Sequence, residues 1–243
     1  MYSIGNSFII LESVDSTNNY AMAKVHAGLA KHGDTYFSMI QTAGKGQRGK
    51  AWKSGNGENI ILSCIIEPDM FSLTNPFILS MTIALGCYDF VNHYTCSDTT
   101  IKWPNDIYWR DRKAGGILIE NRIKGKQWQY AVVGIGLNIN QTSFSASLIN
   151  PVSLKQITGN TYNIINLAKE LCGSIQNRLD MNNKETILEE YNRHLYKSNK
   201  KVLLKIKNSV FETFIRGVNS NGQLITYNKK EEFFNWGEVE WVK

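Results

Sequence analysis

Apolar and polar positions along the chain fall into two kinds of pattern. Short apolar runs bounded by turn residues predict strands at residues 8–11, 35–41, 59–66, 101–103, 107–109, 113–120 and 128–136. The last four are joined only by short turns, so we expect them to form an antiparallel meander. Longer stretches with helical spacing predict one helix from about residue 17 to 29 and others at 76–94, 163–181 and 184–196.

The pattern changes near the C-terminus. Beyond Val202 it predicts short strands, with glycine turns expected at Gly217, Gly222 and Gly237. A module of about 40 residues is too small for an independent core. We therefore expect a mixed α/β (α+β) domain over residues 1–198 and a small all-β domain over residues 199–243 that packs on it.

Residues 41–52 lie between two predicted strands and read Gln-Thr-Ala-Gly-Lys-Gly-Gln-Arg-Gly-Lys-Ala-Trp. Three glycines and three positive charges stand here: Gly44, Gly46 and Gly49, and Lys45, Arg48 and Lys50. Glycine allows the backbone to bend sharply and to approach a ligand closely. Such a loop favours an anionic, phosphorylated ligand, although a solvated basic hairpin loop would have the same composition.

Two phosphate-binding motifs match this stretch in part, and both fail. The pattern G-x-G-x-x-G fits residues 44–49, but the dinucleotide-binding motif must open a helix, and Ser-Gly-Asn-Gly at residues 54–57 indicates a turn. The P-loop motif ends in Ser or Thr, whose hydroxyl holds magnesium, and Ala51 stands at that position. The sequence therefore predicts neither site.

Composition narrows the class of protein. Of 243 residues, 42% are hydrophobic and 20% are charged, as in ordinary globular domains. The chain has no apolar run long enough for a membrane span and no signal-peptide pattern. Four scattered cysteines indicate reduced thiols in a cytoplasmic protein rather than disulfides or a zinc site. A net charge of +6 permits nucleic-acid binding, but the charge is spread along the chain.

Four segments carry a resemblance to a known family. They are Asp-Ser-Thr-Asn at 15–18, the basic stretch at 41–52, Lys-Trp-Pro-Asn-Asp at 102–106 with Lys-Ala-Gly-Gly at 113–116, and Gly-Ile-Gly-Leu-Asn at 134–138. Each is weak or moderate alone. In this order they resemble the biotin–protein ligases, and the likeness covers nearly the whole chain.

The resemblance implies a fold and a reaction. The fold is a catalytic domain with a mixed, largely antiparallel sheet, similar to class II aminoacyl-tRNA synthetases, and a small C-terminal β-barrel of the Src-homology type. The carboxylate of biotin attacks the α-phosphorus of ATP, with Mg²⁺ as cofactor. A lysine of a biotin carboxyl carrier domain then attacks the biotinyl-adenylate. This chain would be a short form without the family's N-terminal DNA-binding domain, a monomer or homodimer.

The resemblance also assigns roles to residues. Lys113 would be the catalytic group, because joining two anions requires positive charge. Biotin would contact Ser16, Thr17, Asn18, Gln41, Gly44, Lys45, Gly46, Gln47, Lys113 and Gly116. ATP or the adenylate would contact Lys45, Arg48, Lys50, Trp52, Asn105, Asp106 and Asn138, and Asp106 would also bind the metal.

Several of these residues also have purely structural interpretations. Ser16 or Thr17 can cap a helix, Trp52 can be a core residue, Asp106 can cap a turn, and Asn138 can close a loop.

Gln47 departs from the family, because many members carry arginine there and Gln47 supplies no charge. We expect this to affect retention of the adenylate rather than the type of reaction. Two other functions stay open. A lipoate– or octanoate–protein ligase shares the fold, although the Gly-Lys-Gly-Gln-Arg-Gly loop favours biotin. A nucleic-acid-binding module fits the pI near 9.0, but it requires basic and aromatic residues gathered on one face.

The dispersed charge generates a prediction about DNA. Any binding to a DNA duplex should be weak, independent of sequence and steeply weakened by salt, because it would rest on phosphate contacts alone. A filter-binding or anisotropy titration at several salt concentrations measures this. Tight, sequence-specific binding at physiological salt would contradict it.

Overall fold

The computed structural model describes residues 3–68, 75–181 and 183–242. Its main sheet has seven strands in the order β1-β2-β3-β7-β6-β5-β4. Their bounds are β1 Phe8–Val14, β2 Thr35–Gln41, β3 Ile60–Ile66, β4 Thr99–Lys102, β5 Asp106–Trp109, β6 Arg112–Lys124 and β7 Gln127–Leu137. β1 and β2 run parallel and the other neighbouring pairs run antiparallel. The mixed, largely antiparallel sheet and its meander are thus confirmed.

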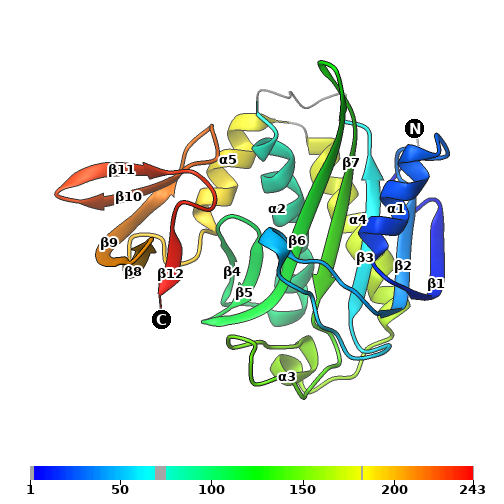
Figure 1. The fold of residues 1–243 in the computed structure, drawn as a ribbon. Coiled ribbons are helices and arrows are strands. Elements are labelled where there is room, and N and C mark those ends of the chain that lie inside the picture. Colours follow the sequence, from blue (N-terminus) through cyan, green and yellow to red (C-terminus); the bar gives the residue numbers. More distant parts are fainter. Residues whose placement is uncertain (1–2, 69–74, 182, 243) are drawn as a thin grey trace.

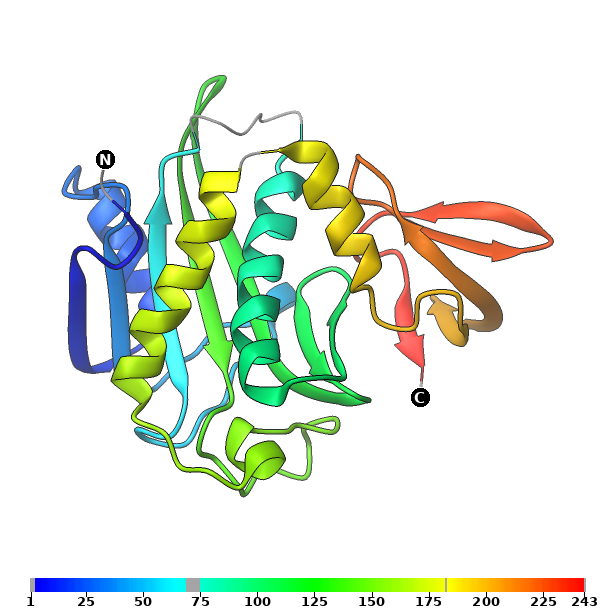
Figure 2. The ribbon, with the colours of Figure 1, turned by 180° about the vertical axis from the view of Figure 1, so that it is seen from behind.

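Helices cover both faces of this sheet. Their bounds are α1 Thr17–His26, α2 Phe77–Thr95, α3 Leu154–Thr158, α4 Ile164–Met181 and α5 Lys184–Arg193. α1 lies in front of the sheet in Figure 1, and α2 and α4 lie behind it, as Figure 2 shows from the other side. None of the helices in the described ranges is long and apolar enough to cross a membrane.

The alternation of side chains along the strands explains these layers. Successive residues of a strand point to opposite faces, so a strand such as β3, which is apolar except for Ser63, can pack against helices on both sides. Two separate clusters result. Phe37, Cys64 and Val133 belong to the cluster with α2 and α4, whereas their neighbours Tyr36, Ile65 and Val132 pack with residues of α1.

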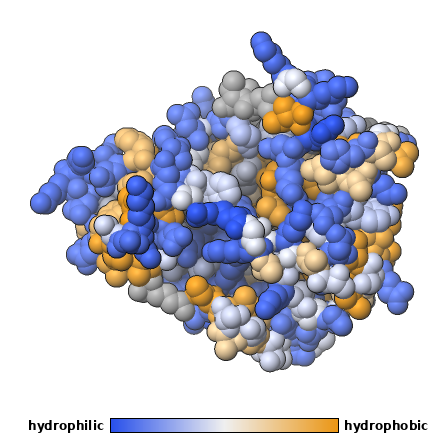
Figure 3. Space-filling model, in the orientation of Figure 1, coloured by the Kyte–Doolittle hydropathy of each residue, from blue (hydrophilic) through white to orange (hydrophobic). Residues whose placement is uncertain are grey.

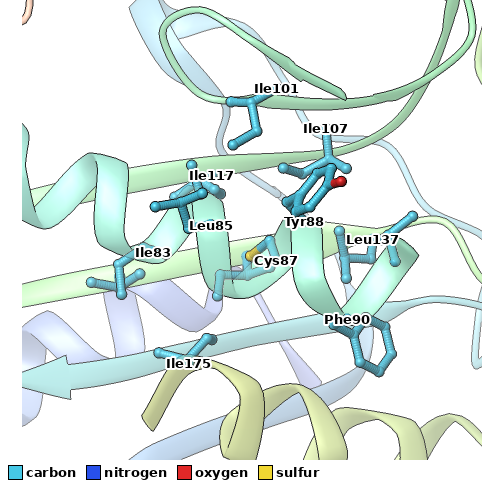
Figure 4. Close-up of a cluster of buried hydrophobic side chains, with 14 of the residues drawn as sticks. Ile83, Leu85, Cys87, Tyr88, Phe90, Ile101, Ile107, Ile117, Leu137 and Ile175 are labelled. Carbon is cyan, nitrogen blue, oxygen red and sulfur yellow. The ribbon is translucent and has the colours of Figure 1, made fainter. Parts of the chain in front are cut away.

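α2 is the centre of the larger cluster. Figure 4 shows its side chains in one buried cluster with Ile107 and Ile117 of the sheet and Ile175 of α4. A Cβ atom on Gly86 would lie 2.9 Å from the Cα atom of Ile175 in α4. The glycine therefore allows the two helices to approach closely. The prediction that this helix is buried is confirmed, since most of its residues are inaccessible to solvent.

The C-terminal strands form a second sheet, in the order β11-β10-β9-β8-β12. Their bounds are β8 Lys201–Ile206, β9 Ser209–Val218, β10 Leu224–Asn228, β11 Lys230–Phe234 and β12 Glu240–Val242. Hydrogen bonds attach this sheet to the rest of the chain. Trp103 Nε1 donates to Gly222 O at 3.0 Å, and the amide group of Asn192 in α5 exchanges two hydrogen bonds with the backbone of Val218.

Some local predictions were wrong. Gly217 lies inside β9 rather than in a turn, and a Cβ atom there would lie 3.1 Å from Asn192 Oδ1. The glycine marks a close approach of α5 to the strand, which is the other common reason for glycine in a strand. α1 ends at His26 and α5 at Arg193, earlier than expected, and the short helix α3 was not predicted.

The contact at Gly222 generates a prediction about stability. Gly222 has φ +80°, and a Cβ atom there would lie 2.4 Å from Phe77 Cγ. Gly222→Ala should lower the free energy of unfolding by about 2–4 kcal/mol, because backbone strain and overpacking add. Gly125→Ala is the matched control, since Gly125 has φ +59° and open space around its Cβ position. Urea denaturation measures both. Equal losses in the two variants would contradict the packing argument.

Candidate active site

The site is built on a part of the main sheet that lacks side chains. Gly116 of β6 lies opposite Gly136 of β7, and Leu118 lies opposite Gly134, so three glycines share one face. A Cβ atom on Gly134 would lie 2.1 Å from Asn18 Oδ1, and one on Gly136 would lie 2.5 Å from Trp52 Cε2. The glycines therefore leave a hollow in the sheet that admits these two side chains.

A pocket lies in this hollow. Its walls come from the start of α1, the end of β2, the following loop, the β4–β5 turn and the strands beneath. The predicted site residues among those that line it are Ser16, Thr17, Asn18, Gln41, Lys45, Gly46, Gln47, Trp52, Asn105, Asp106, Lys113 and Gly116. Figure 3 shows hydrophilic side chains over the middle of this face, in the orientation of Figure 1.

One end of the pocket holds uncharged polar groups. Gln41 Oε1 accepts a hydrogen bond from the backbone N–H of Thr17 at 2.8 Å and lies 3.3 Å from the Thr17 hydroxyl oxygen. Ser63 Oγ lies 2.8 Å from Thr17 Oγ1 and 2.6 Å from Asn18 Oδ1. Ser16 is the N-cap residue just before α1, but its buried hydroxyl makes no cap bond and has no partner among the described residues. An unpaired buried hydroxyl of this kind is suited to a polar ligand.

The other end of the pocket is charged. Lys113 Nζ lies 2.7 Å from Asp106 Oδ1 and 5.8 Å from the centre of the Trp52 ring. Both ionised side chains are about a quarter to a third exposed. A bulge in the β5–β6 pairing lies between Ile107 and Tyr108, next to the pair of Tyr108 with Lys113. An ammonium group can bind a phosphate, and the indole ring beside it can stack on a planar base.

The basic loop crosses the pocket and is attached to β6. Gln47 Nε2 donates to Ile117 O at 3.3 Å, and Asn105 Nδ2 donates to the same oxygen at 2.7 Å. Lys45 Nζ lies 3.7 Å from Glu120 Oε1. The amide of Gln47 therefore connects the loop to the strand that carries Lys113, at the position where many relatives were expected to carry arginine.

Four predicted site residues do not line the pocket. Gly44 packs beside Gln41, because a Cβ atom there would lie 2.4 Å from Gln41 Nε2. Arg48 is exposed and lies 4.0 Å from Glu240 of β12, and Lys50 is exposed. Asn138 is buried and its amide donates to the carbonyls of Lys113 and Val152, so it holds the start of β6 in place. The contact predicted for Gly44 with biotin and the contacts predicted for Arg48, Lys50 and Asn138 with nucleotide stay predictions.

The model of the biotin/lipoate A/B protein ligase family matches residues 10–138, which is more than half of the chain. The chain belongs to this family. The predicted resemblance is therefore confirmed, and the matched range contains every residue of the pocket.

Known relatives agree with this assignment. The bifunctional ligase/repressor BirA of Escherichia coli is 32% identical over 146 residues, which are 60% of this chain and 44% of that protein. The biotin–[acetyl-CoA-carboxylase] ligase of Paracoccus denitrificans is 32% identical over 158 residues, which are 62% of this chain and 63% of that protein. The chain thus matches less than two thirds of the length of either relative.

Solved structures share the fold over almost the whole chain. The biotin protein ligase of Aquifex aeolicus in complex with biotin and ATP has a TM-score of 0.82 at 20% identity, and the match covers 98% of this chain and 99% of that one. The biotin protein ligase of Leishmania major in complex with biotinyl-5-AMP has a TM-score of 0.70 at 22% identity, covering 95% and 99%. The C-terminal sheet is therefore part of the shared fold.

Several residues that line the pocket had no role assigned from the sequence. They are Ile61, Leu62, Ile117, Leu118, Gly134, Ile135 and Gly136. Gly134 and Gly136 could have been found, because a glycine inside a strand indicates a close approach of another group. The apolar residues had no such signal, since each fits an ordinary buried strand.

Lys102 lies near the charged end and is enclosed by aromatic rings. Its Nζ lies 4.8 Å from the ring centre of Tyr108, 5.0 Å from that of Trp241 and 5.6 Å from that of Tyr196. Trp241 comes from β12, so this lysine lies where the two sheets meet. Burial lowers the pKa of Lys102 to about 8, and the positive charges of Lys113 and Lys50 act in the same direction.

This environment generates a prediction about titration. Lys102 should lose its proton near pH 8, well below the ordinary lysine value of 10.5. Because the folded state then binds fewer protons than the unfolded state between these two values, Lys102 should favour folding increasingly as pH rises through this window. NMR of ¹³C-methylated lysines measures the titration, and Lys102→Arg identifies the signal by its loss. A midpoint near 10.5 would contradict the prediction.

Proposed function

We propose that this chain is a biotin–protein ligase, which activates biotin with ATP as biotinyl-5′-adenylate and transfers it to a lysine of a biotin carboxyl carrier domain. One observation carries the proposal. A single pocket joins an uncharged hydrogen-bonding end at Thr17, Asn18 and Gln41 to a charged end at Lys113 and Asp106. Relatives named as biotin ligases support it.

The first step brings two anions together. The biotin carboxylate attacks the α-phosphorus of ATP, a new O–P bond forms, and the bond to pyrophosphate breaks. Lys113 is the group in the pocket that can stabilise the negative charge that develops on the phosphorus oxygens. Lys45, Arg48 and Lys50 raise the positive potential at the entrance, and Trp52 offers its ring face for adenine.

Magnesium is part of the proposal. Asp106 supplies a carboxylate, and Asn105 uses its amide nitrogen on Ile117 O, so the amide oxygen stays available. Mg²⁺ in nucleotide sites is commonly held by one or two carboxylates together with substrate phosphates. The donor set therefore fits a phosphate-bound ion, which would supply further positive charge to the reacting phosphate.

In the second step the amine of the acceptor lysine attacks the acyl carbon of the adenylate. An amide bond forms, AMP leaves, and the amine loses a proton.

The division into two domains is also part of the proposal. The catalytic domain ends near residue 198, and the C-terminal domain, which begins near residue 199, packs beside the site through Trp241. We also propose a cytoplasmic location, which the four free thiols support.

A lipoate or octanoate ligase is the weaker alternative. The dithiolane ring of lipoate and the alkyl chain of octanoate have no N–H or C=O groups to pair with the polar end of the pocket. Each buried polar group left without a partner costs about 1–3 kcal/mol. The hydroxyl of Ser16 and the amides of Asn18 and Gln41 therefore favour biotin.

The direct experiment is modification of a carrier domain. The protein is incubated with biotin, ATP, Mg²⁺ and a biotin carboxyl carrier domain, and the mass of the domain is measured. We expect a mass gain of one biotin that requires ATP and is absent when the acceptor lysine is replaced by arginine. A carrier domain of unchanged mass would refute the proposed function.

Lys113 provides the prediction about rate. Lys113→Ala should slow biotinyl-adenylate formation by about 10²–10³-fold, because one electrostatic group is lost from the transition state. Lys126→Ala is the matched control, since Lys126 is an exposed lysine of the β6–β7 hairpin. Quenched-flow measurement with labelled ATP gives the rate. Near-normal adenylation by Lys113→Ala, with the fold intact, would exclude this role.

A further inference from the structure

A series of hydrogen bonds runs beneath the uncharged end of the pocket, from Glu120 of β6 through Asn18 of α1 to Ser63 of β3, and from there back to Thr17 of α1. Asn18 Nδ2 donates to Glu120 Oε2 at 2.8 Å and lies 3.4 Å from Leu118 O. Ser63 Oγ lies 2.6 Å from Asn18 Oδ1 and 2.8 Å from Thr17 Oγ1. Ser63 is fully buried and Asn18 is 3% exposed, whereas the Glu120 side chain is about a third exposed. Neither Ser63 nor Glu120 was a predicted site residue.

Glu120 determines which groups donate and which accept along this series of hydrogen bonds. An ionised carboxylate and a backbone carbonyl can only accept hydrogen bonds. The side chain of Asn18 must therefore turn its NH₂ group toward Glu120 and Leu118, and its oxygen toward Ser63. Gly134 makes this possible, because a Cβ atom there would lie 2.1 Å from Asn18 Oδ1.

The orientation of Asn18 in turn determines which groups donate at Ser63 and Thr17. Since the oxygen of Asn18 only accepts, the single proton of Ser63 must be donated to it. The oxygen of Ser63 then accepts the proton of Thr17. Gln41 turns its oxygen toward the backbone N–H of Thr17, so its NH₂ group is directed elsewhere.

The remaining hydrogen-bonding capacity forms a definite pattern. Thr17 and Asn18 keep free lone pairs and can accept hydrogen bonds from a ligand. Gln41 Nε2 and the hydroxyl of Ser16 can donate, and no other described residue pairs with either of them. All four side chains line the pocket. The pattern fits a ring in which N–H groups stand beside a carbonyl, as in a cyclic urea.

We propose that Ser63 and Glu120 are positioning residues that set the direction of hydrogen bonding in the pocket, and that this direction selects a cyclic urea over an apolar acyl chain. The inference rests on the proposed function, because biotin carries such a ring. It adds two residues that touch no substrate and act through Asn18 and Thr17. Loss of either should weaken binding of the ring. Both Glu120 variants also lose the ion pair with Lys45, so the difference between the two variants reports the hydrogen bond to Asn18.

A matched pair of variants tests the role of Glu120. In Glu120→Gln the amide oxygen can still accept the bond from Asn18, whereas Glu120→Met has a similar length but only a weakly accepting thioether. Ser63→Ala removes the second link, and Glu12→Met is a control at an exposed glutamate of β1. Calorimetric titration with biotin gives the affinities, and thermal unfolding verifies that each variant is folded.

We expect Glu120→Met and Ser63→Ala to bind biotin about tenfold to a hundredfold more weakly, since each leaves buried polar groups unpaired. Glu120→Gln should stay within about threefold of the unaltered protein because the accepted bond survives. Equal affinity in Glu120→Gln and Glu120→Met, or an unaltered affinity in Ser63→Ala, would overturn the inference.

A second ligand separates this inference from the proposed function. Imidazolidin-2-one is the bare cyclic urea and has no carboxylate to activate. Weaker binding of it by Glu120→Met than by Glu120→Gln supports the inference even if the protein does not adenylate biotin. Failure of the unaltered protein to modify a carrier domain, by contrast, would refute only the proposed function. Identical binding of imidazolidin-2-one by the two Glu120 variants would refute the inference itself.

Discussion

The site depends on a patch of sheet surface without side chains. Gly116, Gly134 and Gly136 lie together on one face of β6 and β7, and Cβ atoms at the last two positions would overlap with Asn18 and Trp52. The rest of the architecture keeps this patch available. Helices α2 and α4 bury the opposite face, while α1 covers only part of the near face and directs its first residues into the hollow. A conventional strand sequence would fill the pocket with its own side chains.

Two kinds of interaction then divide the pocket. At one end, neutral groups in a buried network are held in a single hydrogen-bonding arrangement, where an unpaired group is costly. At the other end, Lys113 and Asp106 form an ion pair that is partly open to solvent. A negatively charged ligand can replace the carboxylate as the partner of Lys113. The arrangement suits a substrate that has a polar ring at one end and a carboxylate at the other.

Much of this could be predicted from the sequence, because the signals were local. Strand periodicity gave the meander, and the motif segments at residues 15–18, 41–52, 102–106 and 113–116 together gave most of the pocket lining. Ser63 could not be predicted, since one serine in the apolar run of β3 fits an ordinary buried strand. Lys102 was part of a motif, but its aromatic surroundings come from residues as distant as Trp241. Such contacts are set by the packing of the two sheets, and no local pattern encodes them.

The central claim is that one pocket binds a cyclic urea and activates the attached carboxylate. ATP–pyrophosphate exchange measured in parallel with biotin, lipoate and octanoate tests it most directly, because the three acids differ mainly in the group that enters the uncharged end. We expect exchange that depends on biotin and is far weaker with the other two acids. Equal or faster exchange with lipoate or octanoate would contradict the account.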